Sequence, residues 1–245
     1  MTENNQKKMR KGVYLLPNLL TTSALFSGFY AIVMSMNGRY ESAAIAIFVA
    51  MILDGLDGRV ARMTNTQSDF GAEYDSLADM VSFGLAPSIL MYAWVLSSMG
   101  KVGWLVAFVY TAAAALRLAR FNTQVGVADK RFFQGLPSPT AAAILAGLVW
   151  VFEDYGLTAT DVSWVIAGLA LIIGVLMVSN VRYHSFKDLD LHGRVPFVMA
   201  LVVVSVLVLV TVQPPVILFL GFLGYALSGP IYTLSALRGL RKQKG

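Results

Sequence analysis

The sequence contains no cysteine and only two histidines among its 245 residues. The lack of cysteine excludes disulfide bonds, thiolate zinc sites and cysteine nucleophiles. Both histidines, His184 and His192, fall in one polar segment, so a histidine-rich metal site is not expected either. Charge is also scarce, because Asp, Glu, Lys and Arg make up 13% of the chain, about half the share typical of soluble domains. With 57% hydrophobic residues, the composition excludes disorder and predicts an integral membrane protein.

Long charge-free runs predict the membrane spans. The first extends from Gly12 to Gly38; about 20 apolar residues cross a bilayer, and a signal peptide has an apolar core of only about 7–15. We therefore expect a retained first helix. Pro214 and Pro215 divide the last long run into two helices. The expected fold class is all-α, a bundle of about eight transmembrane helices over residues 13–36, 41–62, 71–98, 102–122, 137–153, 162–181, 195–212 and 215–236.

Basic residues mark one side of this predicted bundle. With eight spans both termini lie on the same side, and every Lys and Arg except Arg39 and Lys101 falls there too. Cytoplasmic loops carry the excess of Lys and Arg, so we expect both termini to be cytoplasmic and the protein to lie in the cell (inner) membrane. The net charge of +5 comes from residues spread between apolar runs, which indicates contact with membrane lipids rather than nucleic acid.

Four aspartates at predicted helix ends are the main candidate functional residues. Asp54 and Asp57 are three residues apart, and Asp75 and Asp79 are four apart, so each pair shares one helix face. The loop between the two helices is short, so we expect antiparallel neighbours whose four carboxylates converge at the cytoplasmic surface. Inserting an acidic residue into a membrane helix costs about 2.5–3.5 kcal/mol even on lenient scales, which makes such residues functional by default.

Converging carboxylates repel one another unless cations lie between them. Mg²⁺ prefers oxygen ligands, and two metals can stabilise a displacement at phosphorus, so the pattern predicts a site for two divalent ions, Mg²⁺ or Mn²⁺. Gly58, Gly71 and Ala61 leave the same helix faces bare for a bulky ligand. Arg62 is placed to contact a phosphate. A structural alternative, in which the acids pair with Arg59 and Arg62, leaves the glycines unexplained.

The string Asp54-Gly-Leu-Asp57-Gly58-Arg-Val-Ala61-Arg62, with Gly71, Asp75 and Asp79 following at fixed spacing, resembles the signature of the CDP-alcohol phosphatidyltransferases. The resemblance implies a two-metal site fed by a CDP-linked lipid, and a homodimer. It implies one metal on Asp54, Asp57 and Asp75 and another on Asp54, Asp75 and Asp79. The resemblance also implies that Asp79 acts as the general base that accepts the proton of the acceptor hydroxyl. The cytidine diphosphate pocket would be lined by Gly58, Ala61, Arg62 and Gly71.

Further strings resemble the phosphatidylserine synthase branch of that family. They are Asp75-Ser-Leu-Ala-Asp79-Met-Val-Ser-Phe-Gly84-Leu-Ala-Pro87, Ala115-Leu-Arg117-Leu-Ala-Arg120-Phe-Asn122 and Phe133-Gln-Gly135-Leu-Pro137-Ser138-Pro139. Leu16-Pro17-Asn18 followed by Thr21 is similar to the first-helix entry of the wider family, which places Asn18 and Thr21 among the expected CDP-lipid residues. The branch implies transfer of a phosphatidyl group from CDP-diacylglycerol to the hydroxyl of L-serine, with release of CMP and phosphatidylserine.

The acceptor site is predicted less sharply. Arg117 and Arg120 could bind the serine carboxylate or the donor phosphate bidentately, or act only as positive-inside anchors. Asn122 is expected to bond substrate or to cap its helix, and Asn18 to contact the nucleotide or another helix. Ser138 joins the acceptor or phosphate-binding set. Glycerol 3-phosphate or an inositol phosphate is an alternative acceptor; an ion-coupled transporter is a remote alternative, disfavoured because the acids cluster at one surface.

No repeat or long linker divides the chain, so we expect a single domain over residues 1–245. The basic segment 1–12 is interpreted as an interfacial anchor on anionic headgroups. The catalytic helices are expected within 13–153. The additional helices over 162–236 are interpreted as scaffold and dimer surface.

Overall fold

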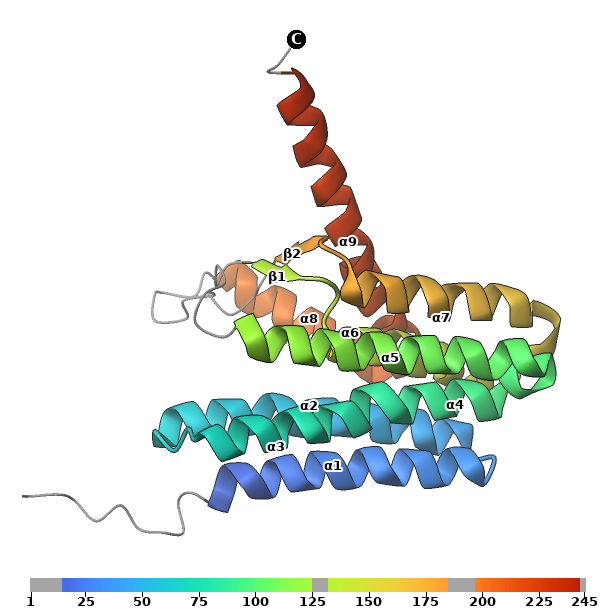
Figure 1. Cartoon of the computed structure of the whole chain (residues 1–245), viewed down its shortest axis with the longest axis horizontal. Helices are drawn as coiled ribbons and strands as arrows, with labels where there is room; N and C mark the ends of the chain where they lie inside the picture. Colours follow the sequence, from blue (N-terminus) through green and yellow to red (C-terminus); the bar gives the residue numbers. More distant parts are fainter. Residues whose placement is uncertain (1–14, 125–131, 185–196, 243–245) are drawn as a thin grey trace, which may run out of the picture.

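The computed structural model of the chain describes residues 15–124, 132–184 and 197–242 (Figure 1). The predicted anchor over 1–12, the loop residues Lys130 and Arg131, and His192 lie outside these ranges. The described elements, in chain order, are α1 (Leu15–Met36), α2 (Tyr40–Thr64), α3 (Asp69–Asp79), η2 (Met80–Leu85), α4 (Ala86–Trp94), η3 (Leu96–Met99), α5 (Lys101–Gln124), β1 (Phe132–Gln134), α6 (Ser138–Asp154), η4 (Thr160–Val162), α7 (Ser163–Val178), β2 (Arg182–His184), α8 (Phe197–Val212) and α9 (Pro214–Lys242).

The predicted helical membrane bundle is confirmed at the level of fold class. Among the described residues, five helical stretches are long and apolar enough to cross a membrane: Leu16–Met36, Asp69–Trp94, Lys101–Thr123, Thr160–Val178 and Pro214–Thr233. Helices α2, α6 and α8 occupy the other three predicted ranges. The count of eight spans and the side of the termini stay predictions. Helices α1 to α7 run roughly along one direction, and the last turns of α9 cross it steeply (Figure 1).

Helix α6 forms the centre of the bundle. It is buried from Thr140 to Val149, and its run of alanines lets neighbouring helices approach closely. It contacts α2, α4, α7 and α9. Gly147 lies against the backbone of Phe219 on α9, where an added Cβ would lie 3.2 Å from the Phe219 Cα. The central helix therefore connects the first five helices to the last ones.

The turn between α2 and α3 brings the two aspartate-bearing helix ends together. Helix α2 ends at Asn65, which adopts the left-handed conformation with φ 53° and ψ 41°. Asparagine tolerates this conformation better than most residues. Helix α3 then begins after Ser68, whose Oγ accepts a hydrogen bond of 3.1 Å from the Gly71 N–H. These two caps reverse the chain within a few residues, so α3 returns antiparallel to α2.

A short antiparallel pair of strands was not predicted. Strand β1 follows α5, strand β2 follows α7, and Phe133 lies opposite Tyr183 in the register. Tyr183 is fully buried and its hydroxyl donates a 3.1 Å hydrogen bond to the carbonyl of Ala226 on α9. The strand pair thus ties the ends of α5 and α7 to the last helix.

Candidate metal centre and active site

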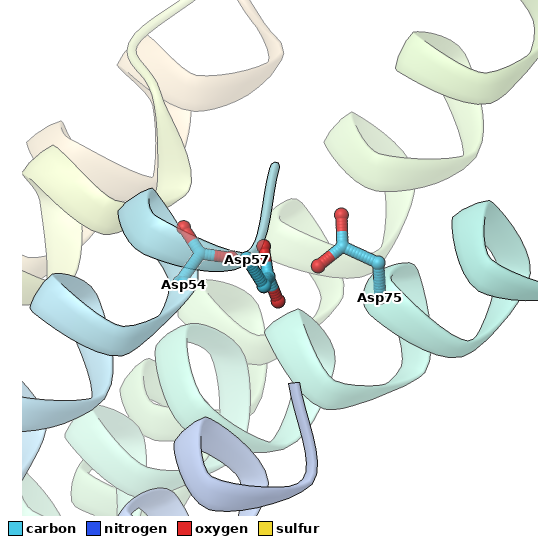
Figure 2. A group of neighbouring side chains, drawn as sticks. All are labelled: Asp54, Asp57 and Asp75. Carbon is cyan, nitrogen blue, oxygen red and sulfur yellow. The ribbon is translucent and has the colours of Figure 1, made fainter. Parts of the chain in front are cut away.

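Three carboxylates gather where α2 meets α3. Asp54, Asp57 and Asp75 each offer an oxygen, and these ligand atoms all lie within 4.8 Å of one another. Figure 2 shows the Asp75 carboxylate pointing from α3 toward the two carboxylates of α2. The spacing of three residues puts both α2 aspartates on one face, and the antiparallel return of α3 supplies the third. Asp57 is 5% exposed, and Asp54 and Asp75 are half-buried.

Asp79 lies one turn further along α3 and contacts a different partner. Its carboxyl group is hydrogen-bonded to that of Asp54. Two carboxylates in such contact must share a proton or a cation, because two bare anions repel. A cationic side chain that acts electrostatically on Asp79 is Arg117 of α5. The four predicted aspartates therefore form a group of three and an Asp54–Asp79 pair that share Asp54.

The residues present fit a divalent cation. The Oδ1 atom of Asp75 is buried and has no hydrogen-bond partner within the described part of the chain. Burying a carboxylate oxygen without a partner is costly, and a cation between Asp75 and the α2 carboxylates would satisfy it. The donor atoms are all carboxylate oxygens, the ligands that Mg²⁺ and similar hard cations prefer.

Helix α1 contacts the group of three through a hydrogen bond to Asp57. The hydroxyl of Thr21 lies 2.6 Å from Asp57 Oδ2 and 3.1 Å from the Pro17 carbonyl, and Thr21 is buried. Asn18 lies one turn earlier, beside the first turn of α3. A Cβ added at Gly71 would lie 3.6 Å from Asn18 Oδ1. Gly71 therefore allows Asn18 to approach α3, and the structure places both predicted α1 residues at the aspartate-bearing end of the bundle.

The other side of the group is open. A Cβ added at Gly58 would meet only the Arg62 Nη1 atom, at 4.0 Å, so Arg62 extends over the bare backbone of Gly58. Arg62 is exposed and Ala61 is half-buried. The Arg62 guanidinium, over the half-buried backbone of Gly58 one turn after Asp54, suits an anionic ligand.

The two candidate arginines of α5 have different surroundings. Arg117 donates a 2.5 Å hydrogen bond to Ser138 Oγ at the start of α6, and it interacts electrostatically with Asp79 and Asp54. The structure thus brings Arg117 and Ser138 to the aspartates. The guanidinium of Arg120 donates instead to protein oxygens at the end of α7, at β1 and at Asn180.

Asn122 bonds another helix of the protein. Its side-chain amide exchanges hydrogen bonds of 3.0 and 3.2 Å with the Ser76 hydroxyl, one residue after Asp75. This contact fixes the end of α5 against α3. The predicted substrate roles of Arg120 and Asn122 stay predictions.

Two tyrosines near Arg117 were missed by the sequence reasoning. Tyr110 lies seven residues earlier on α5, and Tyr225 comes from α9. A spacing of seven places Tyr110 on the same helix face as Arg117, which could have indicated it. Tyr225 had no such indication, because only the packing of α9 brings it there.

Fold and site together define a helical membrane protein with a cluster of carboxylates, a candidate metal site, where two antiparallel helices meet. The model of the CDP-alcohol phosphatidyltransferase family matches residues 14–178, and the chain belongs to this family. The match ends with α7, so it covers every element that carries a predicted site residue. The chain is therefore an enzyme, a transferase of phospholipid biosynthesis.

Relatives in three bacteria are similar over most of the chain. A protein of Helicobacter pylori (strain J99) is 40% identical over 202 residues, covering 82% of this chain and 84% of the relative. A Mycobacterium tuberculosis (strain H37Rv) protein is 38% identical over 180 residues, covering 70% of this chain and 62% of the relative. A Bacillus subtilis (strain 168) protein is 34% identical over 172 residues, covering 70% and 91%. Each is named CDP-diacylglycerol–serine O-phosphatidyltransferase.

Proposed function

We propose that this chain transfers the phosphatidyl group of CDP-diacylglycerol to the hydroxyl of L-serine, forming phosphatidylserine and releasing CMP. The observation that carries the proposal is the group of Asp54, Asp57 and Asp75 within 4.8 Å, with Asp79 and Arg117 beside it. The names of the relatives support serine as the acceptor.

The aspartates are proposed to hold two divalent ions, Mg²⁺ or Mn²⁺. Asp54, Asp57 and Asp75 would hold one; Asp54, Asp75 and Asp79 would hold the other. When bound, such ions supply the positive charge that neutralises a diphosphate and the leaving phosphate. The Arg62 guanidinium over Gly58 would contact the diphosphate of the donor, with Ala61 and Gly71 leaving room for the cytidine.

The transfer itself is a displacement at phosphorus. The serine oxygen forms a new bond to the phosphorus that carries the diacylglycerol. The bond from that phosphorus to the bridging oxygen breaks, and its electron pair leaves with CMP. Asp79 accepts the proton of the serine hydroxyl as a general base.

Arg117 is proposed to bind the carboxylate of the acceptor. It lies beside Asp79, and Ser138 orients its guanidinium through the 2.5 Å hydrogen bond. A carboxylate held there keeps the serine hydroxyl near the base, which favours reaction by proximity.

The test is CMP release by the purified protein in lipid micelles with CDP-diacylglycerol, serine and Mn²⁺ or Mg²⁺. We expect CMP and phosphatidylserine in equal amounts, loss of both with a chelator, and recovery when the metal returns. Parallel reactions with glycerol 3-phosphate and an inositol phosphate identify the acceptor. No CMP release with any of the three acceptors would refute the proposed chemistry, and release with another acceptor alone would refute serine.

We further propose that the chain crosses the cell (inner) membrane eight times as a homodimer, with both termini and the active site facing the cytoplasm. The distribution of Lys and Arg supports this arrangement. The absence of cysteine allows single cysteines to be introduced as labels. Ser97 and Gln67 are exposed at opposite ends of the bundle. In intact cells an impermeant maleimide should label Ser97→Cys and leave Gln67→Cys unlabelled; the reverse pattern would overturn the orientation.

A further inference from the structure

The helix that carries Asp75 and Asp79 changes its winding immediately after Asp79. Residues Met80–Leu85 form a π-helical segment, η2, between α3 and α4. Within it the Ala86 N–H bonds to the Val81 carbonyl, five residues earlier. A π turn holds one residue more than an α turn, so the flanking faces are rotated by about 100° relative to a continuous α-helix. Such segments are frequent at functional sites.

This rotation has a consequence for the site. Helix α3 turns Asp75 and Asp79 toward α2 and α5, while α4 buries Leu90 and Met91 in the core. If the helix were α-helical throughout, the aspartate face of α3 and the buried face of α4 could not both keep these directions. One of them would be shifted by one residue position. The direction in which Asp79 points therefore depends on η2 keeping its extra residue.

A buried tyrosine holds η2 from the side of α5. The hydroxyl of Tyr110 donates a 3.0 Å hydrogen bond to the carbonyl of Phe83, in the middle of the segment. Tyr110 is 1% exposed and Phe83 is fully buried, so water cannot replace this bond. Tyr110 also lies two turns before Arg117 on the same helix. One helix thus carries both the group that holds η2 and the cation beside Asp79.

Helix α1 holds η2 from another side. An added Cβ at Gly28 would lie 2.7 Å from the Cα of Ser82, so only glycine permits this approach. The Ser82 hydroxyl donates a 3.1 Å hydrogen bond to the Ala24 carbonyl, one turn before Gly28. The segment is therefore fixed by backbone-level contacts with two neighbouring helices.

We propose that Tyr110, with the Gly28–Ser82 contact, is a positioning residue that sets the rotation of α3 and so holds Asp79 against Asp54 and beside Arg117. The proposal rests on the proposed function, in which Asp79 is the general base. Asp79 is adjacent to η2, Asp75 lies one turn further from it on α3, and Asp54 and Asp57 belong to another helix. Loosening η2 therefore displaces the carboxylate of Asp79 more than the group of Asp54, Asp57 and Asp75.

The first test replaces Tyr110 by phenylalanine, which removes only the hydroxyl. The matched control is Tyr40→Phe, because the Tyr40 hydroxyl donates a similar 2.9 Å hydrogen bond to Ala93 at the far end of the same span. A displacement of the base by a fraction of an ångström to 1 Å lowers turnover by about 10- to 100-fold. We expect such a fall in kcat for Tyr110→Phe and wild-type kcat for Tyr40→Phe.

A second variant perturbs η2 from α1. Gly28→Ala pushes on the Ser82 backbone, and Gly168→Ala is its control because nothing lies within 4 Å of a Cβ at Gly168. The affinity for the Mn²⁺ proposed on Asp54, Asp57 and Asp75, followed by its electron paramagnetic resonance, and KM for CDP-diacylglycerol should stay near wild type in Tyr110→Phe and in Gly28→Ala. A general loss of structure would instead lower kcat, metal affinity and thermal stability together.

The outcomes separate this proposal from the proposed function. If the wild type turns over and both variants keep the kcat of their controls, the positioning role is wrong and the proposed function stands. A loss of metal affinity equal to the loss of kcat also overturns it, because η2 would then support the whole aspartate group. If the wild type releases no CMP, the proposed function itself fails.

Discussion

The hydroxyl of Thr21 lies 2.6 Å from Asp57 Oδ2, and this pair joins α1 to the candidate metal site. Both residues are buried, with 4% and 5% of their surface exposed. The hydroxyl has one proton, and an ionised carboxylate is a stronger acceptor than the nearby Pro17 carbonyl. Thr21 therefore contacts the candidate metal site through Asp57. Its predicted contact with the CDP-lipid stays a prediction.

Replacing Thr21 by valine should weaken metal binding. A lost hydrogen bond to a charged group costs about 1.5–3 kcal/mol, and this corresponds to roughly 10- to 100-fold in affinity. We expect such a rise in the Mn²⁺ concentration needed for half-maximal activity. Thr21→Ser keeps the hydroxyl and should stay near wild type. Thr111→Val, which removes a similar bond to the Ala107 carbonyl, is the control for helix stability. Equal metal requirements in Thr21→Val and Thr111→Val would contradict the role of Thr21.

Asparagine at position 79 should abolish turnover and leave the metal-binding group of three in place. General-base catalysis contributes about 10²- to 10⁴-fold, and an amide cannot accept the proton. We expect Asp79→Asn to lose activity on that scale while one Mn²⁺ still binds, and Asp57→Asn to lose metal binding as well. Asp69 and Glu73 are exposed on the same helix, so Asp69→Asn and Glu73→Gln serve as controls. Full activity in Asp79→Asn would remove Asp79 as the base.

The helices could be predicted well because membrane insertion leaves a simple pattern. Charge-free runs bounded by Lys, Arg and Pro predicted α1, α5, α6, α7 and α8 to within a few residues, and the apolar first half of α2 predicted that helix despite the charges in its second half. The π-helical segment could not be predicted, because apolar periodicity does not distinguish one extra residue in a buried span. The Tyr110 bond to Phe83 that accompanies it joins residues 27 apart in sequence. Strands β1 and β2 are three residues each and pair across α6 and α7, so no local pattern marks them.

The approach of Asp54, Asp57 and Asp75 was predictable from their spacing and the short loop between their helices, and the different surroundings of the two arginines of α5 were not. Arg117 and Arg120 are three residues apart and look equivalent in sequence. The difference comes from partners on other elements: Ser138 and the aspartates for Arg117, and Gln134 with the end of α7 for Arg120. Spacing within one helix cannot show which partner a side chain finds across the bundle.

Lysine substitutions should separate these two arginines. Lysine keeps the charge and loses the bidentate fork. We expect Arg117→Lys to raise KM for serine by about 10-fold or more with little change in thermal stability. Arg120→Lys should lower the Tm, because its guanidinium bonds four protein oxygens, and leave KM for serine unchanged. Arg39→Lys, an exposed change outside the site, is the control. A raised serine KM in Arg120→Lys with an unchanged Tm would assign the acceptor to Arg120 instead.

Gly229 determines how closely β2 can approach α9. A Cβ added there would lie 2.8 Å from the Tyr183 ring carbon Cδ1, and the fully buried ring cannot swing into solvent. Burial raises the pKa of the Tyr183 phenol to about 12, so the hydroxyl stays protonated and keeps donating to the Ala226 carbonyl. Overpacking of this kind costs about 1–3 kcal/mol. Gly229→Ala should therefore lower the Tm in detergent.

The control for this variant is Gly221→Ala on the same helix, because nothing lies within 4 Å of a Cβ at Gly221. Both variants add one methyl group within α9, at buried Gly229 or at exposed Gly221, so a Tm that falls further in Gly229→Ala reports the Tyr183 contact. In a protein that already carries Tyr183→Ala, adding Gly229→Ala should lower the Tm less than Gly229→Ala does in the wild type. The added methyl group then meets no ring. If Gly229→Ala melts like Gly221→Ala, the ring does not pack against Gly229 and β2 does not dock on α9 as described.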